Sequence, residues 1–250
     1  MKRYFIRLFC FSSLCFLLFS CTKNSEKLSF PALSDYYPLQ TGHVLIYRLD
    51  SSLIPLYGSD LEIRSYHAKD SIADTLRDNA GRLSYRIYHF VTDTLESQPW
   101  IPVSTFIATP QDQTIEFVDD NNLRFLKMKQ PLRDYFSWAG NTYIDTKSST
   151  SPFQYLDGWN YTYQNVGQPY TVEMGTLDNT VTVLQQDETS PPGPFDPGSY
   201  QQRNYSIEVY AKGIGLVYKE FLHRTWQTTP EPAKFENDTY GIKLSLIGYR

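Results

Sequence analysis

Cysteine is scarce in this chain and confined to its beginning. The 250 residues contain three cysteines, Cys10, Cys15 and Cys21, and none follows position 21. A disulfide framework, a zinc–thiolate site and a cysteine nucleophile are therefore excluded from residues 22–250. Whatever fold this part of the chain adopts must be stabilised by packing and hydrogen bonds.

Recognisable catalytic motifs are also missing. The four histidines have no metal-ligand spacing, and there is no nucleophile elbow, Ser-x-x-Lys motif or phosphate-binding glycine loop. His67, Asp70 and Asp74 form the densest cluster, but strand neighbours three apart point to opposite faces. We expect no catalytic residues, no metal and no cofactor. The alternative, a glycan hydrolase, would need two carboxyl groups facing each other across a cleft, and no pair stands out.

The first 21 residues have the pattern of a secretory signal sequence. Lys2, Arg3 and Arg7 precede an apolar run at residues 8–19 that is too short to span a membrane as a helix. Residues 18–21, Leu-Phe-Ser-Cys, resemble a bacterial lipobox. We expect residues 1–20 to be removed as a signal peptide and Cys21 to be lipidated with diacylglycerol and palmitate. The alternative is a plain secretory signal in which Cys21 is incidental.

Removal of this leader makes the chain more acidic. The net charge is −4 for the whole sequence and falls to −7 without the three basic residues of the leader. An acidic body argues against nucleic acid as a partner. Residues 21–34 are mostly polar and predict a flexible tether, followed by a single domain at residues 35–250.

The chain has a β composition, with 16% aromatic residues and 20 tyrosines. Residues 83–92 alternate strictly between two faces, as in a half-buried strand, and no segment shows a convincing helical period. Asn- and Asp-containing turns are expected at 120–122 and 177–179, a Lys-Gly turn at 212–213, and a loop at 190–199. This pattern predicts an antiparallel meander that forms a curved sheet, half-barrel or sandwich, with at most short helices. The expected strands are 44–49, 61–67, 83–92, 114–118, 123–127, 170–175, 180–185, 205–211, 216–222 and 242–249.

One aromatic-rich region stands out as a candidate binding surface. Trp138, Trp159, Tyr161 and Tyr163 offer large flat faces with polar handles, which suit stacking on sugar rings or apolar ligands. Packing within a β core is the alternative role for these side chains.

The chain resembles a family of uncharacterised Bacteroidota outer-membrane lipoproteins. The lipobox, residues 36–42 (YYPLQTG) and residues 208–220 (EVYAKGIGLVYKE) carry the resemblance. It implies an all-β envelope protein held on the outer membrane by its lipid. We expect a non-catalytic role in ligand binding or assembly, with a lipid, a glycan or an envelope protein as partner. Asp-Ser/Thr-apolar triplets also resemble the O-glycosylation motif of that phylum, which makes Ser71, Thr75 and Thr94 candidate acceptors.

Overall fold

The computed structural model describes residues 29–55, 60–229 and 231–250. The chain divides into residues 1–30 and a compact unit at residues 31–250, to which the following description refers. The predicted signal peptide, Cys21 and most of the tether lie outside the described residues. The end of the predicted tether belongs to the folded unit, because helix α2 (Leu33–Tyr36) begins there and Leu33 is buried.

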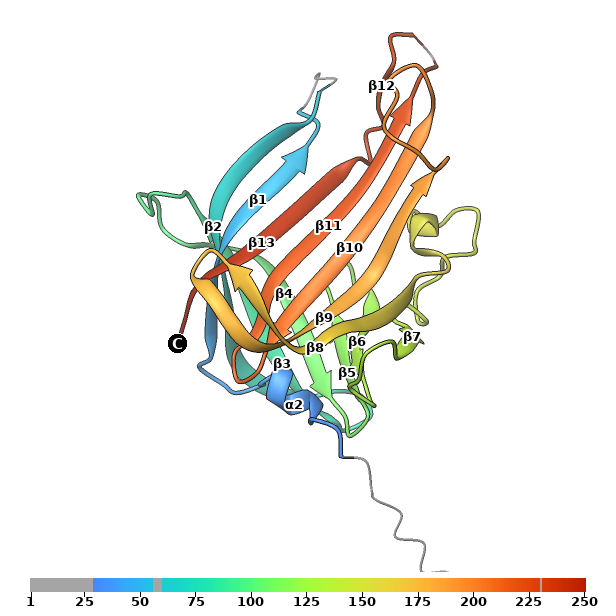
Figure 1. The fold of residues 1–250 in the computed structure, drawn as a ribbon. Coiled ribbons are helices and arrows are strands. Elements are labelled where there is room, and N and C mark those ends of the chain that lie inside the picture. Colours follow the sequence, from blue (N-terminus) through green and yellow to red (C-terminus); the bar gives the residue numbers. More distant parts are fainter. Residues whose placement is uncertain (1–28, 56–59, 230) are drawn as a thin grey trace, which may run out of the picture. The chain divides into compact units, whose positions relative to one another are not determined.

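The unit is a single antiparallel sheet, which confirms the expected fold class (Figure 1). The strands follow in the order β6-β5-β4-β3-β2-β1-β13-β11-β10-β9-β8-β7, and β12 pairs with β11 outside this path. Apart from α2, the described helical structure is the short 3-10 helix η2 (Gln154–Leu156). The strands are β1 (Val44–Leu53), β2 (Glu62–Arg77), β3 (Leu83–Thr92), β4 (Ile101–Pro110), β5 (Thr114–Val118), β6 (Arg124–Lys129), β7 (Ser137–Ala139), β8 (Asn160–Val172), β9 (Gly175–Ser190), β10 (Gln201–Ala211), β11 (Gly215–Gln227), β12 (Lys234–Phe235) and β13 (Tyr240–Tyr249).

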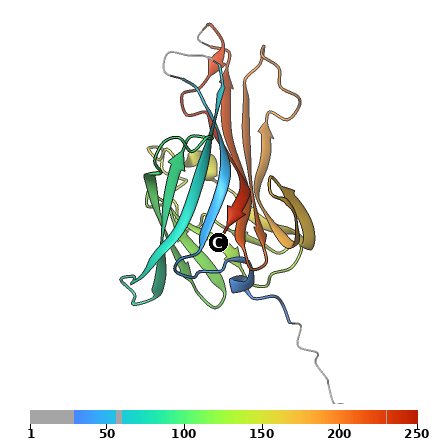
Figure 2. The same ribbon diagram turned by 90° about the vertical axis from the view of Figure 1, so that its left-hand side faces the viewer.

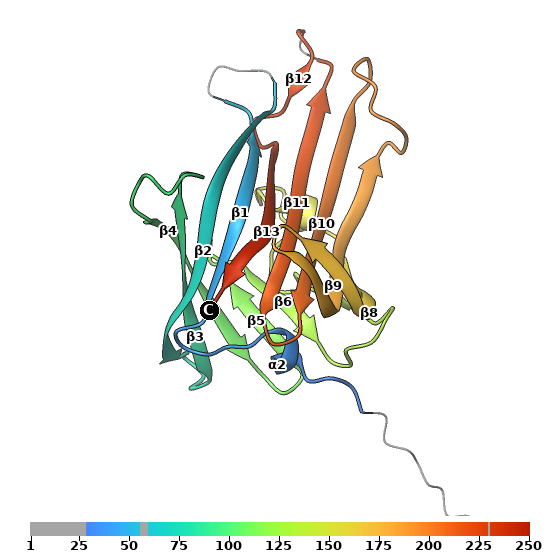
Figure 3. The same ribbon diagram turned by 60° about the vertical axis from the view of Figure 1, so that its left-hand side comes forward.

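Two meanders are joined edge to edge. Strands β1 to β6 pair with their neighbours in sequence, and so do β7 to β11. The pairing of β1 with β13 connects the two halves, in a register that runs from Leu45 opposite Tyr249 to Leu53 opposite Tyr240. The strands curve around an interior, as Figures 2 and 3 show. One face of each strand therefore points inward.

The sheet is nearly closed into a barrel where β6 meets β7 and β8. The backbone N–H of Leu126 donates to the carbonyl of Gly140, and the indole Nε1 of Trp138 donates to the carbonyl of Leu126 at 2.8 Å. The Tyr163 hydroxyl accepts from the N–H of Lys129 and donates to its carbonyl, both at 2.9 Å. Side chains thus supply hydrogen bonds that a backbone ladder would make elsewhere in the sheet.

Replacing Tyr163 by phenylalanine tests this seam. The change keeps the ring but leaves the N–H and carbonyl of Lys129 without their partner, so we expect a loss of about 1–3 kcal/mol in the free energy of unfolding. Denaturant titration followed by circular dichroism measures it. Tyr143→Phe is the control, because the Tyr143 side chain is largely exposed. Equal stability of the two variants would show that the seam does not depend on the hydroxyl.

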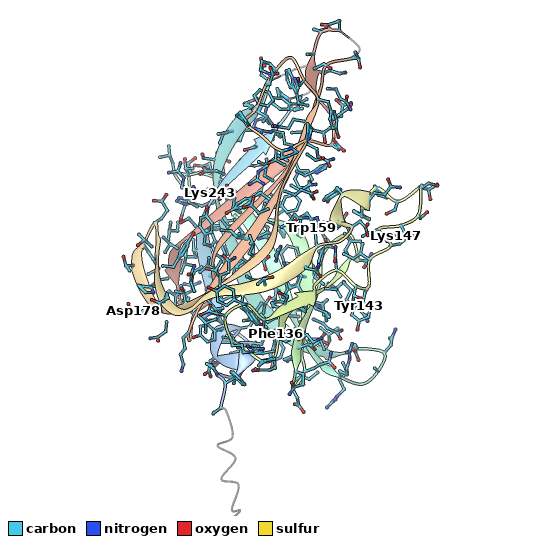
Figure 4. All side chains as sticks on the ribbon, turned by 45° about the vertical axis from the view of Figure 1, so that its right-hand side comes forward. Phe136, Tyr143, Lys147, Trp159, Asp178 and Lys243 are labelled. Carbon is cyan, nitrogen blue, oxygen red and sulfur yellow. The ribbon has the colours of Figure 1, made fainter. Side chains whose placement is uncertain are left out.

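The hairpin of β8 and β9 folds over the outer face of β13. The N–H of Glu173 donates to Ser245 Oγ, and the N–H of Met174 donates to the carbonyl of Leu246. These two residues form the turn, so the turn expected at residues 177–179 is wrong. Asn179 has φ 53° and lies in a β-bulge of β9, because the register advances by three residues there against two in β8. Asn tolerates a left-handed backbone in a bulge as well as in a turn; Figure 4 labels the neighbouring Asp178.

The remaining turn predictions are confirmed. Asp120 and Asn121 form the turn between β5 and β6, and Lys212 and Gly213 lie in the turn between β10 and β11. The proline-rich segment at residues 191–200 connects β9 to β10 as an exposed loop.

Candidate functional site

A cavity of about 390 Å³ lies inside the curved sheet. Its walls are inward-facing side chains, and two connecting segments complete it. Tyr37 and Pro38 follow α2, at the lower end in Figure 1. Tyr155 and Leu156 come from the segment between β7 and β8 that carries η2, which lies higher in the same view.

Every second residue of a strand points inward. Most of the residues at these inward positions are apolar or aromatic, and they form most of the cavity wall. On β1 the inward positions are Leu45, Tyr47 and Leu49, which alternate with outward polar residues such as Arg48. Further apolar wall residues come from β2, β3, β4, β5, β6, β11 and β13: Ile72, Ile87, Phe106, Phe117, Phe125, Leu216, Phe221, Ile242 and Leu244.

A buried ion pair interrupts the apolar wall. Lys127 Nζ on β6 lies 2.5 Å from Glu208 Oε1 on β10, and Lys219 Nζ on β11 lies 3.8 Å from the same oxygen. The Tyr210 hydroxyl donates to Glu208 Oε2 at 2.6 Å. Glu208 is 1% exposed, and the side chain of Lys127 is 10% exposed. Lys127 thereby connects one wall of the sheet to the opposite one.

Charge pairing favours the carboxylate form of Glu208. Burial by itself would raise the pKa of Glu208, but the charges of Lys127 and Lys219 outweigh it and hold this pKa below its usual range. Burial lowers the pKa of Lys127, and the carboxylate of Glu208 offsets part of that effect. The cluster contains two basic side chains and one carboxyl group, and the carboxyl group of Asp119, which also lines the cavity, adds to the effect of Glu208 on Lys127.

Gln185 on β9 adds an unpartnered donor. The residue is 4% exposed, lines the cavity, and accepts a hydrogen bond at Oε1 from Ser206 Oγ at 2.7 Å. Its Nε2 is buried and has no hydrogen-bond partner within the described part of the chain. A buried N–H without a partner costs free energy, so such a group in a cavity wall points to a missing acceptor.

The other carboxyl groups of the cavity wall are engaged in local contacts. Asp70 Oδ1 lies 2.5 Å from His89 Nδ1, and Asp120 accepts from Ser104 Oγ at 2.6 Å. Asp119 Oδ1 accepts the backbone N–H groups of the β5–β6 turn at Asn121 and Leu123. Burial raises the pKa of Asp119.

The four aromatic residues that the sequence grouped together belong to one buried core cluster, in which the ring of Trp138 lies 5.8 Å from that of Tyr161 and 4.6 Å from that of Tyr163. Trp159 and Tyr161 line the cavity, whereas Trp138 and Tyr163 pack at the seam of the sheet, and all four are buried. Trp159 Nε1 donates to the carbonyl of Tyr155 at 2.8 Å. Figure 4 shows Trp159 with Lys147 and Tyr143 on the preceding segment, both exposed. None of the four is exposed on the outer surface, and of the four only Trp159 and Tyr161 line the cavity.

The candidate glycosylation sites lie on the β2–β3 part of the sheet. Ser71 is half-buried within β2, while Thr75 in β2 and Thr94 after β3 are exposed. The sequence cluster around Asp70 is not brought together. His67 pairs with Glu96 at 3.0 Å, Asp70 with His89, and Asp74 with Arg86.

Sequence reasoning missed the polar residues of the cavity. Lys127 and Glu208 are charged residues flanked by apolar ones within strands, whereas Gln185 lies between Leu184 and Gln186. Glu208 shares its inward face with Ser206 and Tyr210. A charged residue between apolar neighbours in a strand was the available sequence signal for a polar group inside the sheet. It identified no site, because Lys127 and Glu208 are 81 residues apart and only the closure of the sheet brings them together.

Within residues 29–55, 60–229 and 231–250, no group of three or more His, Cys, Asp or Glu side chains is arranged to hold a metal ion. The same residues contain no helix with the length and apolarity needed to cross a membrane. Comparison with known proteins gives no match to a protein-family model, a curated protein or a solved structure.

Proposed function

We propose that this protein is a lipoprotein, held on the outer membrane through Cys21, that binds a small apolar molecule inside its curved sheet without changing it chemically. The anchoring part rests on the lipobox-like residues 18–21 and on the resemblance to Bacteroidota envelope lipoproteins. The binding part rests on the cavity.

The cavity is the observation that carries the proposal. Its volume of about 390 Å³ lies within the range of roughly 300–1,000 Å³ of small-molecule sites, which are concave, mainly apolar and supplied with a few polar groups. A volume near the lower end of that range suits one acyl chain or a ligand of similar size. An apolar ligand would gain by leaving water for this wall.

Binding is favoured over the alternative of glycan hydrolysis. A hydrolase needs one carboxyl group free to donate a proton and a second free to act as base or nucleophile. Asp119 has the raised pKa of an acid, but its Oδ1 accepts two backbone N–H groups of a turn. Glu208 has a lowered pKa and is paired with Lys127. The wall is also more apolar than a sugar ligand requires.

Native mass spectrometry of the full-length protein, extracted from envelopes in mild detergent, tests the proposal. We expect a retained mass that corresponds to a small apolar molecule. Ile242→Trp places a bulky ring in the cavity and should abolish that mass. The control is Lys243→Trp, because Lys243 is the exposed neighbour on the outer face of β13. A bare mass for the folded wild-type protein, or a ligand retained equally by Ile242→Trp, would contradict binding in the cavity.

A further inference from the structure

We infer that the ligand of this cavity carries a carboxylate head group, which lies against Lys127, Lys219 and Gln185, with its apolar chain along the aromatic wall. The inference rests on the proposed function and specifies the ligand class. It begins from the placement of the three side chains. Glu208 on β10 is directly opposite Lys219 on β11, and Gln185 on β9 is bonded to Ser206, two residues before Glu208 on the same face.

The hydrogen-bond inventory of this cluster has a surplus of donors. Both oxygens of Glu208 are occupied, one by Lys127 and the other by the Tyr210 hydroxyl. The amide oxygen of Gln185 is occupied by Ser206. Lys127 Nζ also lies over the rings of Phe117 and Phe125, 5.2 and 5.4 Å from their centroids, and the side chain of Lys219 is 29% exposed. Both N–H groups of Gln185 Nε2 have no partner among the residues that the structure describes. An acceptor with several lone pairs would complete the cluster.

The positive charge of the lysine side chains favours an anionic acceptor over a neutral one. Lys219 lies 3.8 Å from Glu208, beyond hydrogen-bonding distance, and Glu208 already neutralises Lys127 at 2.5 Å. The positive charge of Lys219 is thus left without a hydrogen-bonded carboxylate at the cavity wall, on a side chain that is 29% exposed, and it is screened less there than a fully exposed charge would be. A carboxylate would neutralise it and accept the free N–H groups in charge-assisted hydrogen bonds. Asp119 and Asp120 also line the cavity, and they would oppose an anion that bound close to their turn.

The apolar wall around the cluster indicates that the rest of the ligand is apolar. The cluster interrupts a wall that is otherwise formed by side chains such as Phe117, Phe125 and Tyr161. A head group held at the cluster leaves its apolar tail in contact with these rings. The site therefore fits a single-chain amphiphile with an anionic head, of which a free fatty acid is the simplest form.

Three probes of equal chain length separate the head-group contribution from the tail: octanoate, octan-1-ol and octylamine. Binding is measured by calorimetry on the full-length protein in detergent. We expect octanoate to bind about tenfold more tightly than octanol, as one charge-assisted hydrogen bond implies, and octylamine to bind more weakly than both. Lys219→Met should remove the preference for octanoate over octanol. Gln185→Leu should reduce the preference.

Lys243→Met is the matched control. Lys243 is one strand away on β13, beside the position opposite Lys219, but it is exposed on the outer face. The preference for octanoate should survive that change. Equal binding of octanoate and octanol, or tighter binding of octylamine, would overturn the head-group inference while leaving cavity binding intact. If none of the three probes binds, the proposed function itself fails.

Discussion

Replacing Cys21 by alanine is expected to move the protein from the membrane fraction to the soluble fraction. The lipobox-like segment predicts that the thiol of Cys21 carries the lipid, and each buried methylene of an acyl chain contributes about 0.8 kcal/mol to membrane binding. Several chains together make the anchor effectively permanent. Fractionation of envelopes after a high-salt wash, followed by immunodetection, measures the shift.

Cys15→Ala is the control for this experiment. Cys15 lies in the segment that we expect to be removed, so its replacement should leave the protein in the membrane fraction. Sedimentation of the Cys21→Ala protein with membranes after the wash would contradict the anchor. Release of both variants would point to a defect of the leader rather than to lipidation at position 21.

The ion pair between Lys127 and Glu208 is expected to give the largest effect on stability. Removing one partner of a buried pair leaves an uncompensated charge, so Glu208→Gln, which strands Lys127, should cost about 3–5 kcal/mol. Lys127→Met should cost less, because Lys219 remains 3.8 Å from Glu208. The double variant should cost much less than the two single changes added together, because no buried charge is then left without its counterion in this pair. Urea unfolding of all four proteins measures the coupling free energy.

A surface pair in the same molecule provides the comparison. Lys147 and Asp157 are as close, at 2.6 Å, but their side chains are 81% and 42% exposed. Lys147→Met should therefore cost no more than about 1 kcal/mol. Additive effects at Lys127 and Glu208, or a cost of Lys127→Met as small as that of Lys147→Met, would show that the buried pair is not coupled.

The sequence sufficed for the class of fold because alternation is a local property. Residues 83–92 predicted β3 from their period of two, and the Asp-Asn-Asn segment predicted the turn between β5 and β6 from backbone preference. Strand β4 was not among the expected strands; it contains Pro102 and ends at Pro110, and proline lacks the N–H donor of a ladder. Sequence rules of short range therefore predicted the strands and turns that depend on neighbouring residues alone.

The cavity could not be predicted in the same way. Its polar cluster combines Lys127, Gln185 and Glu208 from three strands, and their meeting depends on the number of strands and on closure at the seam. The aromatic residues show the same limit. Trp138 and Trp159 are close in sequence, yet one packs at the seam and the other lines the cavity. Which face of a strand is internal is a property of the whole sheet.

The pairing of β1 with β13 has a consequence for how the protein folds. Residues 240–249 supply the neighbour of residues 44–53, so the wall of the cavity stays open until this later segment has paired. Until then β1 and β11 each present a free strand edge, which is a template for pairing with other chains. Contacts of such long range also form slowly. Two strand edges therefore stay unpaired until residues 240–249 are in place, and only then can the cavity close.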